Sequence, residues 1–296
     1  YEPGSLTLVA RAGTPLAEIE TALATEGQRL AFEPMDHRGL MGTEGAPTIG
    51  GVVAANVSGP RRVSVGACRD FMLGVRFVDG VGNIVKNGGR VMKNVTGYDL
   101  VKMMTGSWGT LGVLTEVSLK VLPRPETCAC VMIDGLSDAE AVRAMAKALG
   151  SPFEVTGAAH VPVGLDGQPV TMLRLEGFAG SVAYRAQQVA ALFGDHAVRV
   201  ESDPEAVTKG WAWVRDVTPF HGADGDVWRV SCTPSDAPEL AGRMRADGLL
   251  YDWGGGLIWV RIPAGTDLRD RLGQFDGHAT LVRGTGQPKF QPEPAP

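Results

Sequence analysis

The 296-residue sequence lacks the features that mark several common functional classes. Its four cysteines, Cys68, Cys128, Cys130 and Cys232, include no C-x-x-C pair, so the usual ligands of a structural zinc site or an iron–sulfur cluster are missing. No apolar run approaches the roughly 18 residues that a membrane-spanning helix requires. The formal net charge of −5 leaves no general basic surface for nucleic acid or an anionic membrane. We therefore expect neither a metal centre nor direct binding to these partners.

What is present indicates a globular protein of two domains. A chain of this length, with 44% apolar residues, can build two cores of ordinary size. The cysteines are typical of free, mostly buried thiols in a reducing compartment. We therefore expect a cytoplasmic protein.

The first part of the chain, to about residue 123, mixes strands with short helices. The pattern predicts a strand over Ser5–Arg11 and a helix that Thr14 caps, with Pro15 as its first residue and Gly27 at its end. A hairpin turning at Asp79-Gly80 follows, then a short helix in "TGYDLVKMMTG" and a long strand in "LGVLTEVSLKVLP". These elements predict an α+β domain.

The second part, residues 124–296, is more regular. After the proline-containing linker "VLPRPET", the order β-α-β-β-α-β of a ferredoxin-like unit occurs over about 127–201 and again over about 226–283. Two such units either extend one sheet or pack side by side. We expect this α+β domain to form a cap over the first domain.

The segment "APTIGGVVAANVSGPRR", residues 46–62, is unfavourable for a regular helix or strand. Each glycine in such an element lowers its stability by up to about 1 kcal/mol relative to alanine, because glycine loses more backbone entropy. Glycines let a ligand touch the backbone, and amides at a helix start point toward anions. A second glycine-rich turn, "SWGTLGVLTE", lies at residues 107–116. The order is not G-x-G-x-x-G after a first strand, which disfavours a Rossmann site. A binding edge for a diphosphate or a ring and a plain packing corner both remain open.

Several segments together resemble a known family: "PTIGGVVAANVSGPRR", "VGACRDFMLGVRFVDGVGNIVKNGG", "KNVTGYDLVKMMTGSWGTLGVLTEVSLKVLP" and "YDWGGGLIWVRIP". They are similar to the PCMH-type FAD-binding domain and cap of the vanillyl-alcohol-oxidase flavoproteins. Within that superfamily they resemble the FAD-binding subunits of bacterial glycolate oxidases. The resemblance covers essentially the whole chain.

The resemblance implies that FAD is the cofactor, and it implies which residues line it. Thr48, Ile49, Gly50 and Gly51 would lie along the FAD, and Asn56, Ser58 and Gly59 close to its diphosphate or flavin; Gly112, Val113 and Leu114 would contact the far part of the dinucleotide, and Pro34 the flavin. The sequence departs from the family pattern at both ends. An earlier glycine-rich turn and a C-terminal segment that returns toward the flavin are expected to lie outside this sequence.

The implied function is oxidation of a CH–OH group: glycolate, or another 2-hydroxy acid, would become glyoxylate or the matching oxo acid. The implied partners are a sister FAD-linked oxidase subunit and an iron–sulfur subunit, through which the complex would associate with a membrane. The alternative is a structural subunit whose weak or degenerate FAD site supports a catalytic sister. A stand-alone oxidase that uses oxygen ranks last, because no substrate base is evident.

No catalytic residue is predicted, because His160, His196, His221 and His278 stand apart in the sequence. For four further features, a structural role is preferred over a functional one. Cys68 is expected to be a buried thiol rather than a flavin link, Trp211 a core or interface residue rather than a gate, Arg215 an ion-pair partner of Asp216 rather than a substrate ligand, and "RRVSV" at residues 61–65 a solvated turn.

Overall fold

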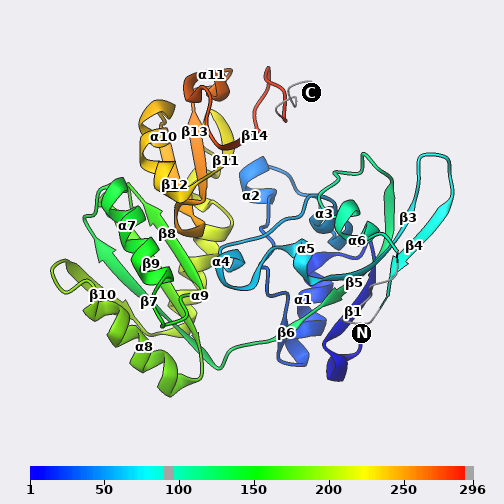
Figure 1. Cartoon of the computed structure of the whole chain (residues 1–296), viewed down its shortest axis with the longest axis horizontal. Helices are drawn as coiled ribbons and strands as arrows, with labels where there is room; N and C mark the ends of the chain where they lie inside the picture. The colour runs from blue at the N-terminus through cyan, green and yellow to red at the C-terminus, as the bar shows by residue number, and fades with distance from the viewer. Residues whose placement is uncertain (90–96, 291–296) are drawn as a thin grey trace. The chain divides into compact units, whose positions relative to one another are not determined.

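The structure, a computed structural model, describes residues 1–89 and 97–290 and divides into two compact units (Figure 1). The first unit comprises Tyr1–Arg38 and Thr43–Arg124, and the second comprises Gly39–Gly42 and the chain from Pro125 onward. The chain therefore crosses between the units three times. Residues 93–96, which begin one of the flavin-type segments, lie outside the described residues.

The first unit is built on a four-stranded antiparallel sheet in the order β1-β5-β3-β4. Its strands are β1 (Thr7–Arg11), β3 (Met72–Val78), β4 (Ile84–Gly88) and β5 (Val113–Lys120). The helices α1 (Leu16–Thr25), α3 (Ile49–Ala54), α5 (Cys68–Phe71) and α6 (Leu100–Met104) share one apolar core with it. Shorter elements of this unit are η1 (Pro3–Ser5), β2 (Gln28–Arg29), α4 (Arg62–Val65) and β6 (Leu122–Pro123); α2 (Arg38–Met41) lies mostly in the Gly39–Gly42 segment of the second unit. The predicted hairpin is present, and the Asp79 carboxylate accepts hydrogen bonds from the amides of Val81 and Asn83 at 3.0 and 2.8 Å.

The predicted cap of α1 is wrong. The helix begins at Leu16 with Pro15 in the capping position, and no side chain caps it. The amide of Leu16 instead donates to the carbonyl of Pro47 at 2.8 Å, and the carbonyl of Thr14 accepts from the amide of Ile49 at 3.0 Å. Backbone partners from a distant segment thus replace the Thr14 hydroxyl, and they tie the start of α1 to the start of α3.

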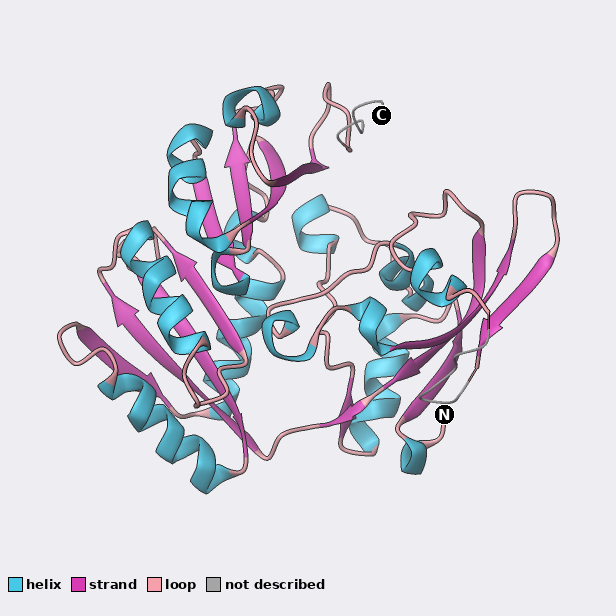
Figure 2. Cartoon of the chain, in the orientation of Figure 1, coloured by secondary structure: helices cyan, strands magenta, loops and turns pink. Residues whose placement is uncertain are grey.

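The second unit confirms two ferredoxin-like halves and shows that they extend one sheet (Figure 2). The eight strands run in the order β10-β7-β9-β8-β12-β13-β11-β14. The first half contains β7 (Thr127–Asp134), α7 (Asp138–Leu149), β8 (Gly157–Val161), β9 (Val170–Gly177), α8 (Ala179–Ala191) and β10 (Ala197–Glu201). The second contains β11 (Asp226–Cys232), α10 (Ala237–Met244), β12 (Gly248–Asp252), β13 (Leu257–Ile262), α11 (Leu268–Leu272) and β14 (Gly277–Arg283). Each half is complete, and the two meet edge to edge between β8 and β12.

The two faces of this large sheet are covered differently. Helices α7, α8, α10 and α11 share a single apolar core with the sheet. On β9, Leu173 and Leu175 point into that core, so Arg174 between them faces the other side. There the guanidinium of Arg174 stacks 4.6 Å from the ring of Trp211, on helix α9 (Pro204–Arg215). Helix α9 therefore packs on the opposite face; η2 (Thr218–Phe220) follows it, and η3 (Pro234–Asp236) precedes α10.

A buried polar cluster joins the halves at the seam between β8 and β12. Tyr251 of β12 pairs with His160 of β8, and its hydroxyl donates to Asp138 Oδ2 at 2.7 Å. His160 is fully buried, with Nε2 lying 3.3 Å from Asp138 Oδ1 and Nδ1 lying 3.0 Å from Thr171 Oγ1. Asp138 starts α7, so the cluster connects a helix and two strands of the first half to the second half.

The "DWGGG" segment belongs to the same seam. It forms η4 (Trp253–Gly255), in which Gly254 has φ 68° and Gly255 has φ 103°. A Cβ atom on Gly254 would lie 2.6 Å from Leu149 Cδ1 of α7. These glycines let the second half approach the helix of the first half closely.

The seam predicts an acid-dependent stability. The imidazole of His160, and after it the hydroxyl of Tyr251, hold the pKa of Asp138 below its ordinary value. A lowered pKa in the folded state means that the ionised group stabilises the fold above about pH 4, the unfolded pKa, and that this is lost as pH falls through the folded pKa. We expect Tyr251→Phe to lower the unfolding free energy by about 1–2 kcal/mol at pH 7, because the carboxylate loses a hydrogen bond.

Thermal unfolding between pH 2.5 and pH 7, followed by circular dichroism, checks this prediction. The difference between wild type and Asp138→Asn is expected to shrink below about pH 4, where the wild-type carboxyl also becomes neutral. Asp134→Asn is the control, because Asp134 pairs with Arg199 at 2.9 Å on the surface. If the difference in thermal stability between wild type and Asp138→Asn stays the same from pH 2.5 to pH 7, the prediction is wrong.

Candidate flavin site

The short helix α3 is held firmly at its start. Thr48 precedes it, and Thr48 Oγ1 accepts a hydrogen bond from the amide of Gly51 at 3.3 Å. Ile49 and Val53 are fully buried in the core of the first unit. The amide of Gly50 donates to the carbonyl of Ala12 at 2.8 Å. Residues 48–51 thus form a fixed edge beside the end of β1.

The two glycines of that edge have different surroundings. A Cβ atom on Gly50 would lie 2.6 Å from Ala12 Cβ and 2.7 Å from the Ala12 carbonyl oxygen, so packing requires glycine there. Gly51 is exposed, and among the described residues a Cβ atom on it would meet only Thr48 Oγ1, at 3.5 Å. The open part of the edge, where a ligand can approach the backbone, is therefore at Gly51.

The loop that follows α3 uses its polar side chains to hold itself in place. Asn56 has a left-handed backbone, with φ 50°, and its Oδ1 accepts from the amide of Arg69 at 3.0 Å. Ser58 Oγ accepts from the amide of Cys68 at 2.9 Å and donates to the carbonyl of Asn56 at 3.2 Å. The amide of Gly59 donates to the carbonyl of Phe32 at 2.8 Å. Asn56 and Ser58 thus shape this backbone through contacts within the chain.

The expectation of a solvated turn at residues 61–65 is wrong for Arg61. This side chain is buried, lies 3.0 Å from a Glu33 carboxylate oxygen and donates to the carbonyl of Ala31 at 3.1 Å. Its amide donates to the second Glu33 oxygen at 2.8 Å. Glu33 has φ 48°, and the buried Pro34 follows it directly. The ion pair therefore fixes the bend that positions Pro34.

The second glycine-rich turn is attached to α3. The amide of Gly106 donates to the carbonyl of Val53 at 3.0 Å, and the amide of Trp108 donates to that of Ala54 at 2.9 Å. Between them, the buried Ser107 Oγ has no hydrogen-bond partner within the described part of the chain. Our reading of the sequence missed Ser107, whose only signal there was a small polar residue inside a glycine-rich turn.

The same turn leads to the three predicted residues Gly112, Val113 and Leu114, of which the last two begin β5. Gly112 has φ 154°, and a Cβ atom on it would lie 2.6 Å from the carbonyl oxygen of Val78. Leu114 packs against the core. Val113 is exposed, as are Trp108 and Leu111 of the turn.

These features fit a flavin dinucleotide. Gly51 gives access to the backbone, and Ser107 Oγ has no hydrogen-bond partner among the residues that the structure describes. Trp108, Leu111 and Val113 expose apolar surface of the kind that planar rings contact. The 106–109 turn is hydrogen-bonded to the carbonyls of Val53 and Ala54 at the C-terminal end of α3, and the 56–59 loop follows that same end in the chain. The hydrogen bond from the Gly59 amide to the Phe32 carbonyl ties the 56–59 loop to the segment that leads to Pro34.

Three of the four expected structural roles are confirmed. Cys68 is fully buried, and burial raises the pKa of its thiol to about 12. Trp211 is buried on the sheet of the second unit. Arg215 forms a two-pronged ion pair with its neighbour Asp216, at 2.8 and 2.7 Å.

The structure gives the histidines separate surroundings. His160 lies in the seam cluster, and His221 Nε2 lies 2.7 Å from the carbonyl oxygen of Asp216. Within residues 1–89 and 97–290, no group of three or more His, Cys, Asp or Glu side chains is placed to hold a metal ion.

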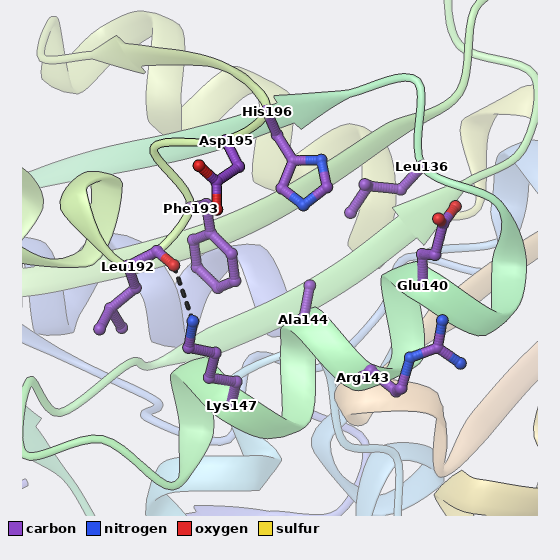
Figure 3. A pocket seen from close by; sticks show the side chains of 9 residues that line it. All are labelled: Leu136, Glu140, Arg143, Ala144, Lys147, Leu192, Phe193, Asp195 and His196. Carbon is purple, nitrogen blue, oxygen red and sulfur yellow. Dashed lines mark hydrogen bonds between the residues drawn. The ribbon is translucent and has the colours of Figure 1, made fainter.

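A pocket of about 330 Å³ lies on the second unit, between α7 and the turn after α8 (Figure 3). Lys147 Nζ donates to the carbonyl of Leu192 at 2.7 Å and lies over the ring of Phe193. The remaining lining residues are Leu136, Glu140, Arg143, Ala144, Asp195 and His196. Two acidic and two basic side chains balance each other, so the pocket favours neither sign of ligand charge. All nine residues belong to the second unit, so this pocket is separate from the glycine-lined edge.

Comparison with known proteins supports a flavin site in the first unit. The family described as "FAD binding domain" matches residues 1–88. The glycolate oxidase subunit GlcE of Escherichia coli K12 is 39% identical over 300 residues, which cover 100% of this chain and 77% of that protein. The glycolate oxidase subunit GlcD of Bacillus subtilis is 35% identical over 123 residues, covering 42% of this chain and 25% of that protein.

Solved structures support the fold. A chain of alkyldihydroxyacetonephosphate synthase matches 87% of this chain with a TM-score of 0.65 and 18% identity. The present chain spans 55% of that protein's chain. At 18% identity, the match shows the fold alone. Among the described residues, no helix has the length and apolar character needed to cross a membrane.

Proposed function

Because this chain belongs to the family of the glycolate oxidase subunit GlcE, we propose that it is the FAD-binding subunit of a complex that oxidises glycolate to glyoxylate. Its family is one of FAD-linked oxidoreductases acting on CH–OH groups. The observation that carries the proposal is the open backbone at Gly51, beside the loop and the turn anchored to α3.

In the proposed site, Gly51, the 56–59 loop and the 106–109 turn have different roles. The Gly51 backbone would face the cofactor, and the backbone of residues 56–59 would follow it. Ser107 Oγ would gain the hydrogen-bond partner that it lacks within residues 1–89 and 97–290. The apolar surface at Trp108 and Val113 would contact a ring and exclude water from it. When bound, FAD supplies the acceptor for the hydride equivalent that leaves the CH–OH carbon.

The proposed partners are a sister FAD-linked subunit and an iron–sulfur subunit. The chain has no C-x-x-C pair, and two of its four cysteines are fully or almost fully buried. Electrons leaving its flavin would therefore pass to a cluster held by another chain, and association with a membrane would come through such partners.

Purification of the complex from its natural source tests the proposal. We expect one FAD for each copy of this chain, and we expect glycolate to bleach the visible flavin absorbance. If the chain carries no flavin while the complex still oxidises glycolate, the structural-subunit alternative replaces the proposal.

A further inference from the structure

The two edges of the eight-stranded sheet in the second unit are treated differently. At one edge, β14 is covered by the chain itself: the amide of Leu281 donates to the carbonyl of Lys289 at 3.0 Å, and Arg269 donates to the carbonyls of Pro288 and Lys289 at 2.9 and 3.0 Å. At the other edge, β10 pairs with β7 on one side, and within the described residues no strand pairs with its other side. The backbone of β10 is therefore available for pairing with a further strand.

Helix α8, which contacts β10 and lies with it at the left margin of Figure 1, has a solvent face without charge. Its one charged residue, Arg185, is buried and donates to the carbonyls of Phe153 and Glu176 at 3.1 and 2.8 Å. Helix α7 on the same sheet, by contrast, exposes three charged side chains. A solvent-facing helix normally carries charged residues on its outer face, so the face of α8 is suited to burial. Its exposed residues are Ala179, Gly180, Ser181, Ala183, Tyr184, Gln187 and Ala191.

A second copy of this chain fits this surface. In a two-fold interface the same patch of each copy meets its equivalent, so a patch of one charge repels itself and an uncharged helix does not. Exposed apolar side chains flank the edge as well: Phe178, just before α8, is 78% exposed, Tyr184 is 59% exposed and Val200 of β10 is 42% exposed. Val198, two residues before Val200, packs against the core that α8 covers, so Val200 lies on the α8 face of the sheet.

The side chains of β10 select one register for antiparallel pairing with a second copy. A two-fold axis perpendicular to the sheet keeps each side chain on its own face, and directly opposite residues share a face, so the axis passes through a residue. An axis at Val198 sets Arg199 opposite Ala197, and an axis at Arg199 sets two guanidinium groups opposite each other. An axis at Val200 sets Arg199 opposite Glu201 of the second copy, and does so twice. Of these three registers, the one centred on Val200 pairs opposite charges.

We propose that two copies of this chain associate through β10, with the two-fold axis at Val200. The two sheets then continue into each other, and the two α8 helices lie on the same face of the joined sheet. Arg199, which pairs with Asp134 of β7 at 2.9 Å, lies between that carboxylate and Glu201 of the second copy. The inference uses residues of the second unit alone and does not depend on the proposed function.

Disulfide cross-linking of the full chain tests the register. Directly opposite residues have Cβ atoms about 4.5–5.5 Å apart, close to the separation in a disulfide, so Val200→Cys is expected to form covalent dimers under mild oxidation. Val198→Cys is the matched control on the same strand and face, because its two copies are offset by four residues, about 13 Å. We expect Val200→Cys to cross-link at least about tenfold faster than Val198→Cys or the wild type on non-reducing gels. An equimolar mixture of the two variants that cross-links faster than Val200→Cys alone places the axis at Arg199 and overturns the register.

Self-association of the chain tests the interface itself. Light scattering after gel filtration is expected to show a dimer for the wild type at about 100 μM, and Glu201→Lys is expected to raise the Kd of that dimer at least about tenfold. Glu44→Lys, at an exposed position of the first unit, makes the same change in net charge and is expected to leave the Kd unchanged. A wild-type monomer at this concentration, or an equal effect of the two substitutions, overturns the inference. If the chain alone is a monomer and hydrogen exchange at residues 197–201 slows in the complex, another subunit occupies the edge and a second copy does not.

Discussion

Arg61→Met is expected to lower the unfolding free energy by about 3–5 kcal/mol, as breaking a buried ion pair commonly does. The Arg61 and Glu33 side chains are only 6% and 15% exposed, and their closest charged atoms are 3.0 Å apart. The substitution leaves the Glu33 carboxylate in a poorly hydrated position without its guanidinium. It also removes a donor to the Ala31 carbonyl. Urea unfolding followed by tryptophan fluorescence measures the loss.

Two further variants show whether the missing partner causes that loss. Arg38→Met breaks the ion pair between Arg38 and Asp36, whose side chains are 48% and 33% exposed. This substitution is expected to lower the unfolding free energy by less than about 1 kcal/mol. The double variant Arg61→Met with Glu33→Gln is expected to recover part of the stability, because no buried charge then remains at the site. A single Arg61→Met variant as stable as Arg38→Met would refute the prediction.

Gly51→Phe is expected to weaken FAD binding at least about a hundredfold, a loss of about 2.7 kcal/mol, while leaving the fold intact. Gly51 is exposed, and a Cβ atom on it would lie 3.5 Å from Thr48 Oγ1, an ordinary van der Waals distance, so a side chain can project outward without colliding with this neighbour. A ring projecting from this position would occupy the place of the cofactor. Glycine is also a poor helix residue, so the replacement does not weaken α3 through propensity.

Gly50→Ala is the matched comparison for Gly51→Phe. Its methyl group would lie within 2.7 Å of Ala12, so the expected loss is in thermal stability. Flavin fluorescence titration and thermal unfolding of both variants separate the two effects. If Gly51→Phe binds FAD as tightly as the wild type, Gly51 does not face the cofactor and the proposed site is wrong.

The elements with local signals could be predicted from the sequence. The capping box of α7, in which Ser137 and Glu140 bond to each other, is visible as S-x-x-E before an apolar pattern. The β-α-β-β-α-β order of each half follows from such signals and from strand alternation. The glycine-rich edge was also visible, but the different surroundings of Gly50 and Gly51 were not, because Ala12 lies on another segment.

The structural features that could not be predicted from the sequence depend on contacts between residues that are far apart along the chain. The burial of Arg61 requires Glu33, 28 residues earlier, and a pair of adjacent arginines alone indicates exposure. Likewise, whether the two halves share a sheet depends on the pairing of Tyr251 with His160, which no local pattern encodes. The hydrogen bond from the Arg283 guanidinium to the Leu40 carbonyl, within the second unit, is the most distant of these cases, since 243 residues separate the two partners.

The seam between β8 and β12 also has a consequence during synthesis. The first half is complete at Glu201, but β12 ends only at Asp252. At a synthesis rate of about 5–20 residues per second, the edge of β8 stays unpaired for roughly 3–10 s before β12 has been synthesised. An uncovered strand edge is a template for pairing with another chain. Nascent copies on one messenger are therefore most exposed to co-aggregation in this interval, and a chaperone that shields β8 would act there.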